Sequence, residues 1–235
     1  DRVGGTGMSA CSLCDDTGWS FTAAAPEECP CGAAGRLRLE GELRRARFPR
    51  AYLSGATIKP WVPSGPLQVA ALALIQRWGS EFAPGAPGLW LAGRCGAGKS
   101  HLAATALFAV IASGRSAVWW NMADLLAEIQ GTFDGSGTAE RVLADALAAD
   151  CVVLDDLGAT KLTDWSLSII LRLLNNRIDN DRTTIVTTNL TKAQSLENLG
   201  ERIASRIYDV APESNKIVAN WDDYREKRHK GKRDE

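Results

Sequence analysis

The octapeptide GRCGAGKS, Gly93 to Ser100, limits the possible folds of this 235-residue chain more than any other stretch. It fits the pattern G-x-x-x-x-G-K-[ST] without a mismatch, and it lies between an apolar run, GLWLA, and a helical run, SHLAATALF. Glycines let the backbone wrap around a phosphate chain with its N–H groups directed inward, and the start of the following helix adds a favourable partial charge. A glycine-rich turn that arises by chance lacks this context, so we predict a phosphate-binding loop.

Two residues of this loop have predicted roles of their own. We expect Lys99 to contact the β- and γ-phosphates of ATP, and Ser100 to supply a hydroxyl group to Mg²⁺. The complete set of expected nucleotide contacts is Gly93, Arg94, Cys95, Gly96, Ala97, Gly98, Lys99, Ser100 and His101.

Around the loop, short apolar runs alternate with amphipathic helical stretches from about residue 48 to about residue 220. Uninterrupted β-branched runs between helices are typical of a parallel sheet that is covered on both faces. We therefore predict an α/β domain. The expected strands are 88–93, 116–121, 151–156 and 183–189, and the expected helices are 67–82, 100–113, 122–130, 138–149 and 165–180.

Composition excludes several other classes of protein. Hydrophobic residues make up 45% and charged residues 23% of the chain, and the formal net charge is −1, so nucleic-acid binding would require a local basic patch. No apolar run reaches the roughly 18 residues that cross a bilayer, and the N-terminus has no signal-peptide pattern. We expect a cytoplasmic protein without a membrane partner, where close cysteine pairs favour a metal over a disulfide.

An acid pair follows the apolar run CVVL: Asp155 and Asp156. Asp155 is placed to reach Mg²⁺, directly or through water, and Asp156 is the candidate to polarise the attacking water. Adjacent acids at the end of a strand can also be helix caps.

Three further polar residues follow the next predicted strand. Asn189 ends the run TTIVTTN and is either a strand terminator or a sensor that hydrogen-bonds the attacking water or the γ-phosphate. Arg202 and Arg206 lie one helical turn apart in GERIASRIYD, and they are either a solvated face or an arginine finger that completes a neighbouring subunit's site.

Four of the six cysteines lie near the N-terminus, at Cys11, Cys14, Cys29 and Cys31. The spacing C-x2-C-x14-C-x-C brings together two thiolate pairs, enough for a tetrahedral zinc site. The second pair has one intervening residue where two to four are usual. Free thiols or two local disulfides are the alternatives. A segment this short would take its folding energy from the metal.

We divide the chain into a zinc-binding module (8–35), a basic connector or linker (36–60), an ATPase domain (61–220) and a charged tail (221–235). The tail is rich in Lys and Arg, and it is either solvated and disordered or a contact for phosphate backbone.

These elements, in this order, resemble the AAA+ ATPases of the DnaC/DnaI helicase-loader and IstB transposition-helper group, from about Arg47 to about Arg225. The narrowest match is VVLDDLGATKLTDWSLSIILRLLNNRIDNDRTTIVTTNL, followed by ERIASRI. The resemblance implies that Asn189 is sensor 1 and that Arg206, supported by Arg202, is the arginine finger. Many AAA+ proteins carry Glu where this chain has Asp156, which implies slow hydrolysis. The chain is too short after Arg206 for an evident C-terminal lid.

By this resemblance the protein is a loader that docks on a hexameric replicative helicase and places it on single-stranded DNA, using ATP, Mg²⁺ and Zn²⁺ and assembling with ATP into a homo-oligomer. Lys161 and Arg172 are the candidate DNA contacts. DnaI-like loaders carry zinc modules that dock on the helicase, although a zinc knuckle can also bind single strands directly. The alternatives are an IstB-like helper of a transposase and a P-loop small-molecule kinase, but neither the Arg-rich lid nor the substrate pocket of such a kinase is visible.

Overall fold

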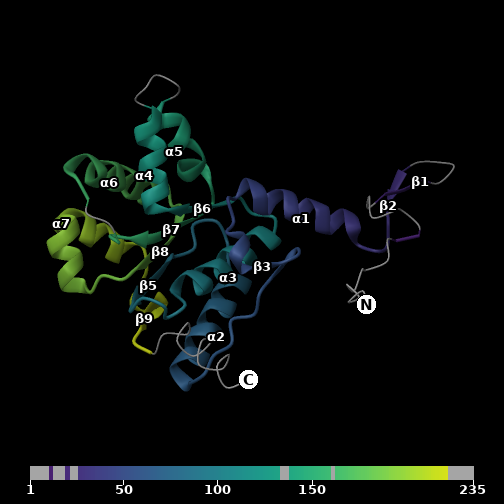
Figure 1. Ribbon diagram of the computed structural model, residues 1–235, viewed down its shortest axis with the longest axis horizontal. Helices are drawn as coiled ribbons and strands as arrows, with labels where there is room; N and C mark the ends of the chain where they lie inside the picture. Colours follow the sequence, from purple (N-terminus) through teal and green to yellow (C-terminus); the bar gives the residue numbers. More distant parts are fainter. Residues whose placement is uncertain (1–10, 13–18, 22–25, 133–137, 160–161, 222–235) are drawn as a thin grey trace, which may run out of the picture.

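The computed structural model describes residues 11–12, 19–21, 26–132, 138–159 and 162–221. Its centre is a five-stranded parallel sheet with helices on both faces, so the predicted α/β class is confirmed (Figure 1). The strand order is β6-β7-β8-β5-β9, and every pair in the sheet is parallel.

The helices of the described part are α1 (Ala33–Arg45), α2 (Pro66–Ser80), α3 (Lys99–Ala112), α4 (Met122–Gly131), α5 (Ala139–Ala148), α6 (Asp164–Asp179) and α7 (Lys192–Asp209), with 3₁₀ turns η1 (Arg50–Tyr52) and η3 (Glu213–Asn215). The sheet strands are β5 (Leu89–Gly93), β6 (Ala117–Asn121), β7 (Cys151–Leu157), β8 (Thr183–Thr188) and β9 (Lys216–Ala219). Two small antiparallel pairs precede them, β1 (Trp19–Phe21) with β2 (Pro26–Glu28) and β3 (Leu53–Ser54) with β4 (Thr57–Ile58). Across these residues, no helix has the length and apolar character of a membrane span.

The two faces of the sheet bury separate cores because successive side chains of a strand point in opposite directions. On β7, Val152 and Leu154 pack with α4, α5, α6 and α7, whereas Cys151 and Val153 pack with α2 and α3. This alternation explains why the apolar run reads as continuous in the sequence. The result is a three-layer domain.

The strand order places the predicted site at the carboxyl ends of the parallel strands. Strand β5 lies between β8 and β9, and the chain then crosses to β6 at the far edge. In open α/β sheets, ligands bind beyond the carboxyl ends of the strands where the order reverses. The loop after β5 and the ends of β7 and β8 meet at that position.

The four predicted strands are all present, each with one boundary shifted by a single residue, but β9 was not predicted. Its sequence, KIVA, is short and follows a polar stretch, so it carries little β signal on its own. Pairing with β5, where Ala92 lies opposite Val218, determines its conformation. After α7, the described residues contain η3 and β9 and no helical lid.

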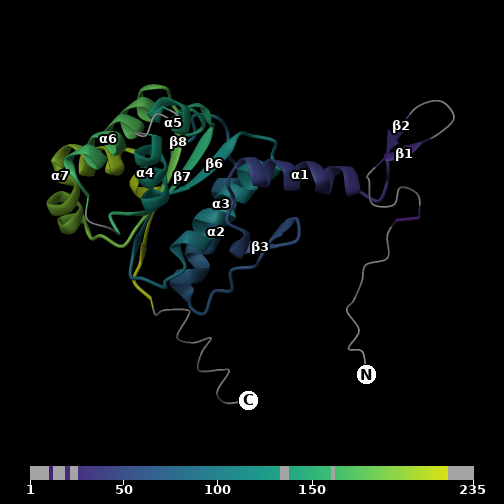
Figure 2. The same ribbon diagram turned by 45° about the horizontal axis from the view of Figure 1, so that its top comes forward.

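The expected connector packs partly onto the ATPase domain. Helix α1 extends away from the domain toward β1 and β2 (Figure 2), but its last turns bury Leu43. Ala46 and Phe48 join the core on the α3 side, next to Trp61 at the start of the ATPase domain, and the N–H of Trp119 donates to the carbonyl of Ala46 at 2.7 Å. Residues of this segment therefore help to cover the α3-side face of the sheet.

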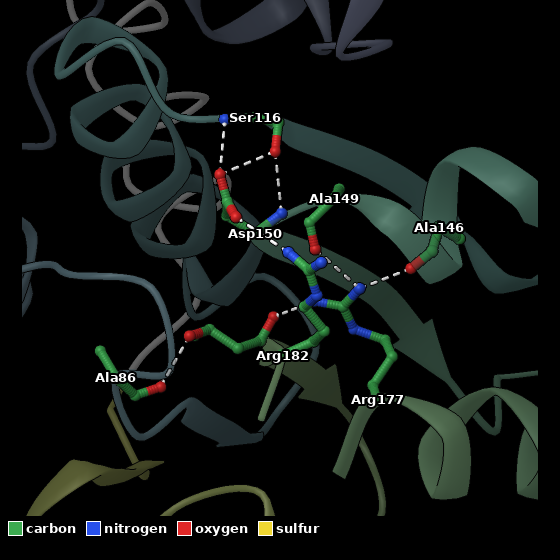
Figure 3. A network of polar contacts seen from close by, with 8 residues as sticks. Ala86, Ser116, Ala146, Ala149, Asp150, Arg177 and Arg182 are labelled. Atoms are coloured by element: carbon green, nitrogen blue, oxygen red, sulfur yellow. Dashed lines mark hydrogen bonds and ion pairs between the residues drawn. The ribbon is translucent and has the colours of Figure 1, made fainter. Parts of the chain in front are cut away.

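A fully buried arginine joins three elements at the other end of the sheet, where the strands begin. Arg177 of α6 donates from Nε to Thr184 Oγ1 at 3.0 Å, and from Nη1 to the carbonyl of Ala149 at 3.0 Å and to that of Ala146. Its Nη2 donates to the carbonyl of Thr183. Burial lowers the pKa of Arg177 to about 10. Figure 3 shows Arg177 beside Ala146 and Ala149, next to the hydrogen bonds of Asp150.

Candidate nucleotide-binding site

The phosphate loop has the backbone conformation that its glycines allow. Gly93, Gly96 and Gly98 have φ angles of 137°, 76° and 85°. A Cβ atom on Gly93 would lie 2.4 Å from the carbonyl oxygen of Ala219, so this position also has no room for a side chain. Helix α3 begins at Lys99, directly after the loop, and its N-terminus faces the loop as an anion site requires.

Lys99 is buried and bends back over the loop. Its Nζ donates to the carbonyls of Gly93 at 2.9 Å and Arg94 at 2.8 Å, and to Oδ1 of Asn189 at 2.6 Å. The whole Lys99 residue is only 7% exposed, and three oxygen acceptors surround its amine. This position suits a cation that neutralises phosphate charge.

The acid pair lies beside Lys99 at the end of β7. Asp155 is buried, and Thr187 Oγ1 donates to its Oδ1 at 2.7 Å. Burial raises the pKa of Asp155, while hydrogen bonds from Thr187 and Ser100 oppose that rise. A hydroxyl and a carboxylate that lie together are ligands of the type that Mg²⁺ prefers. Ser100 and Asp155 therefore fit the predicted magnesium site.

Asp156 has a strained backbone and a defined side-chain partner. Its φ angle of 59° lies in the left-handed region, which is uncommon for a residue with a side chain. Its N–H donates to Thr187 Oγ1 at 2.9 Å, and its Oδ1 accepts from Nδ2 of Asn189, also at 2.9 Å. Strain of this kind occurs at functional sites, where surrounding contacts hold it in place.

Asn189 therefore connects the two halves of the site. Its amide accepts from Lys99 and donates to Asp156, so the three side chains form one hydrogen-bonded chain. The structure brings together the residues that we predicted from three separate stretches. Their chemical roles stay predictions.

Thr187 was not predicted, although it contacts both acids. A threonine in the middle of the buried strand β8 must satisfy its hydroxyl group, and this requirement is the signal that the sequence offered. Which group satisfies it depends on the pairing of β7 with β8.

Arg202 and Arg206 lie outside this chain of hydrogen bonds. They belong to the second part of α7, after a break at Gly200, where φ is 77°. Arg206 pairs with Asp209 at 3.8 Å, and Arg202 is exposed. Within the described ranges, neither arginine makes a hydrogen bond or ion pair with the phosphate loop. Their predicted action on a neighbouring subunit stays a prediction.

The remaining loop residues differ in exposure. Arg94 and Cys95 are exposed, whereas His101 contacts the segment before α2. Its Nε2 lies 2.8 Å from the carbonyl oxygen of Lys59, and its ring is 5.1 Å from that of Tyr52. Burial lowers the pKa of His101, so the neutral ring is favoured.

Three of the four N-terminal cysteines are close together. The Sγ atoms of Cys11, Cys29 and Cys31 all lie within 4.8 Å of one another, and Cys29 is buried. The N–H of Ala33 donates to Cys31 Sγ at 3.4 Å, a contact that stabilises a thiolate. Cys14 lies outside the described residues. Three converging thiols fit a zinc site that one further ligand would complete.

Of the two candidate DNA contacts, only Arg172 lies in the described part of the chain. Lys161 lies outside the described residues. Arg172 is exposed on α6 and pairs with Glu140 at 3.3 Å.

The fold and the site together define a P-loop nucleotide-binding domain of the AAA+ class. A family model described as IstB-like ATP binding protein matches residues 69–232, and the chain belongs to this family. The expected family group is thereby confirmed.

Individual relatives agree with this assignment. The replicative helicase loader DnaC of Escherichia coli K12 is 30% identical over 159 residues, 67% of this chain and 64% of the relative. That of Buchnera aphidicola subsp. Acyrthosiphon pisum is 29% identical over 161 residues, 68% of this chain and 65% of the relative. This chain thus covers less than two thirds of these relatives' length.

Solved structures share the fold. A crystal structure of the DnaC helicase loader matches with a TM-score of 0.61 and 30% identity, covering 67% of this chain and 93% of that one. The crystal structure of DnaI matches with a TM-score of 0.58 and 22% identity, over 69% of this chain and 87% of that one.

Proposed function

We propose that the protein is an ATP-dependent loader that docks on a hexameric replicative DNA helicase and helps place it on single-stranded DNA. The observation that carries the proposal is the Lys99–Asn189–Asp156 chain, because it links the phosphate loop to the group that would activate water. Similarity to relatives named replicative helicase loaders supports the choice of partner.

In this proposal each residue at the site acts on one part of MgATP. Lys99 and the loop N–H groups bind the phosphates, while Ser100 and Asp155 hold the magnesium, which offsets negative charge on the phosphates. Asp156 accepts a proton from the attacking water, and Asn189 orients both the carboxylate and the water. Asp156 is one methylene shorter than a glutamate, so hydrolysis is slow, as suits a switch.

The N-terminal cysteines have a separate role in the proposal. Zinc held by Cys11, Cys14, Cys29 and Cys31 folds a docking module, and ATP drives assembly into a homo-oligomer in which Arg206 reaches the neighbouring site. Assembly also aligns one basic strip per subunit for single-stranded DNA, so binding should be salt-sensitive.

The test is a pull-down of the hexameric helicase from the native host, with and without ATP. We expect capture by the wild-type chain, and loss of capture when Cys29 is replaced by Ser. The fraction of helicase captured should depend on ATP, and Lys99→Ala should remove that dependence. Capture of a transposase instead, with oligomers on duplex DNA, would favour the transposition helper, which the family description also supports.

A further inference from the structure

Two tryptophans contact the phosphate loop at Ala97 and Gly98. Trp221, two residues after β9, donates from Nε1 to the carbonyl oxygen of Ala97 at 2.8 Å. Trp61, which precedes α2, is 7% exposed, and its Nε1 lies 2.5 Å from the point that a Cβ on Gly98 would occupy. The two rings are 6.3 Å apart with an interplanar angle of 55°.

The bond to Ala97 controls the direction of a particular N–H group. The Ala97–Gly98 peptide is trans, because the described chain has no cis peptide bond. In a trans peptide, the C=O and the next N–H point in opposite directions within one plane. Because the Ala97 carbonyl points toward Trp221, the Gly98 N–H points away from Trp221, and a bound phosphate would accept from it on that side. The same hydrogen bond polarises the peptide and strengthens that donor.

Trp61 supports this arrangement by packing. Gly98 has a positive φ of 85° and caps α3 at its N-terminus. Since glycine has no side chain, Gly98 itself does little to restrict rotation of the Ala97–Gly98 peptide plane. The Trp61 ring lies against that position and also belongs to the α3-side core. The Trp61 indole thus takes the place of a side chain at Gly98, while Trp221 holds the Ala97 carbonyl, and together they limit rotation of the peptide plane.

We propose that Trp221 is a positioning residue for the phosphate loop: its indole N–H fixes the Ala97–Gly98 peptide plane for phosphate binding, and nucleotide binding is thereby coupled to the segment that follows β9. This inference rests on the proposed binding of ATP. It assigns a role to a residue outside the loop, the acid pair and the sensor.

The chain offers a matched control for the test. Trp78 also donates from Nε1 to a backbone carbonyl, that of Pro87, at 2.8 Å, and it is also packed in the α3-side core. Trp221→Phe and Trp78→Phe each remove one indole N–H and keep an aromatic ring. Only the first bond ends on the phosphate loop.

We would measure the Kd of MgADP by calorimetry and the Tm without nucleotide for the wild type and both variants. Trp221→Phe should weaken MgADP binding about 3- to 10-fold, the size expected for one hydrogen bond. Trp78→Phe should lower the Tm without changing the Kd. Equal Kd values for the wild type and Trp221→Phe would overturn the role of Trp221. Failure of the wild type itself to bind MgADP would instead overturn the proposed function.

A measurement on the unaltered chain covers the case in which Trp221→Phe does not fold. With ¹⁵N-labelled indoles, the Nε1–H signal of Trp221, assigned through its contacts with Trp61, should shift when MgADP is added. The signal of Trp78 should stay in place. A Trp221 signal that does not move at saturating MgADP would contradict the coupling.

Discussion

The Nζ of Lys99 lies 2.6 Å from Oδ1 of Asn189, a hydrogen bond between residues 90 positions apart in the chain. It fixes the distance between the phosphate loop and the end of β8. Since the same amide donates to Asp156, a change at any of these side chains alters the position of the others.

Substitutions in this chain should separate binding from hydrolysis. Lys99→Ala should weaken ATP binding on the order of 100-fold or more, because the loop loses its buried cation. Asp156→Asn should keep ATP binding and stop hydrolysis, and Asn189→Ala should lower the rate about 10- to 100-fold. Calorimetry and phosphate release measure the two effects. Lys192→Ala, at an exposed position of α7, is the control for loss of a lysine. Unchanged turnover in Asp156→Asn would mean that another group activates the water.

Asp155 should make the stability of the protein depend on pH. Burial raises its pKa in the folded state, so the folded protein holds this proton to a higher pH than the unfolded chain. Stability is therefore lost as the pH rises from about 3.9, the unfolded value, through the raised pKa.

Asp155→Asn removes the loss of stability that comes from ionising a buried carboxyl group, and its side-chain oxygen can still accept from Thr187. Without Mg²⁺ or nucleotide, the variant should be more stable than the wild type at pH 7, and the difference should vanish at acid pH. Thermal unfolding at a series of pH values measures this. The variant should also lose stabilisation by MgATP. A less stable variant at pH 7 would show that the Asp155 carboxylate stabilises the fold.

The sequence was sufficient to predict the loop, the acid pair and Asn189, because each lies directly after an apolar strand in a short local pattern. Thr187, Trp61 and Trp221 could not be found in this way. Their partners are distant in sequence, and only the strand order β6-β7-β8-β5-β9 determines which of them meet. Strand β9 was missed for the same reason.

The predicted arginine finger can be tested by mixing variants. Arg206→Ala should keep ATP affinity in the monomer and lower hydrolysis, since the residue would act on a neighbour's γ-phosphate. Mixing Arg206→Ala with Asp156→Asn should restore part of the activity, because some interfaces then pair an intact site with an intact finger. Arg202→Ala should have a smaller effect. Absence of any restoration across mixing ratios would place the action within one chain.

Metal analysis tests the thiol cluster. The protein should contain one zinc ion per chain, and Cys29→Ser should lose it, because Cys29 is the buried member of the three converging thiols. Cys151→Ala is the control: this thiol lies in β7, burial raises its pKa to about 12, and zinc content should not change. Basal ATP hydrolysis should survive in Cys29→Ser. Zinc-free wild-type protein purified without chelators would contradict the site.

The buried Arg177 should be a major source of stability although it is distant from the nucleotide site. Its guanidinium group donates to the carbonyls of Ala146 and Ala149 at the C-terminal end of α5, where the helix dipole favours a positive charge. It also donates to the carbonyl of Thr183 at the start of β8. One side chain thus satisfies the end of a helix and the start of the central strand.

Arg177→Met should cost roughly 3 kcal/mol, because three buried carbonyl oxygens lose their donors while the volume of the side chain is largely kept. Arg182→Met is the matched control: Arg182 pairs with Asp150 at 3.0 Å, but its side chain is 37% exposed, so its loss should cost under about 1 kcal/mol. Urea unfolding of both variants measures the difference. Below the unfolding transition, both should bind MgADP as the wild type does, because the network lies at the end of the sheet opposite the phosphate loop. Equal costs for the two substitutions would mean that water satisfies the carbonyls once Arg177 is removed.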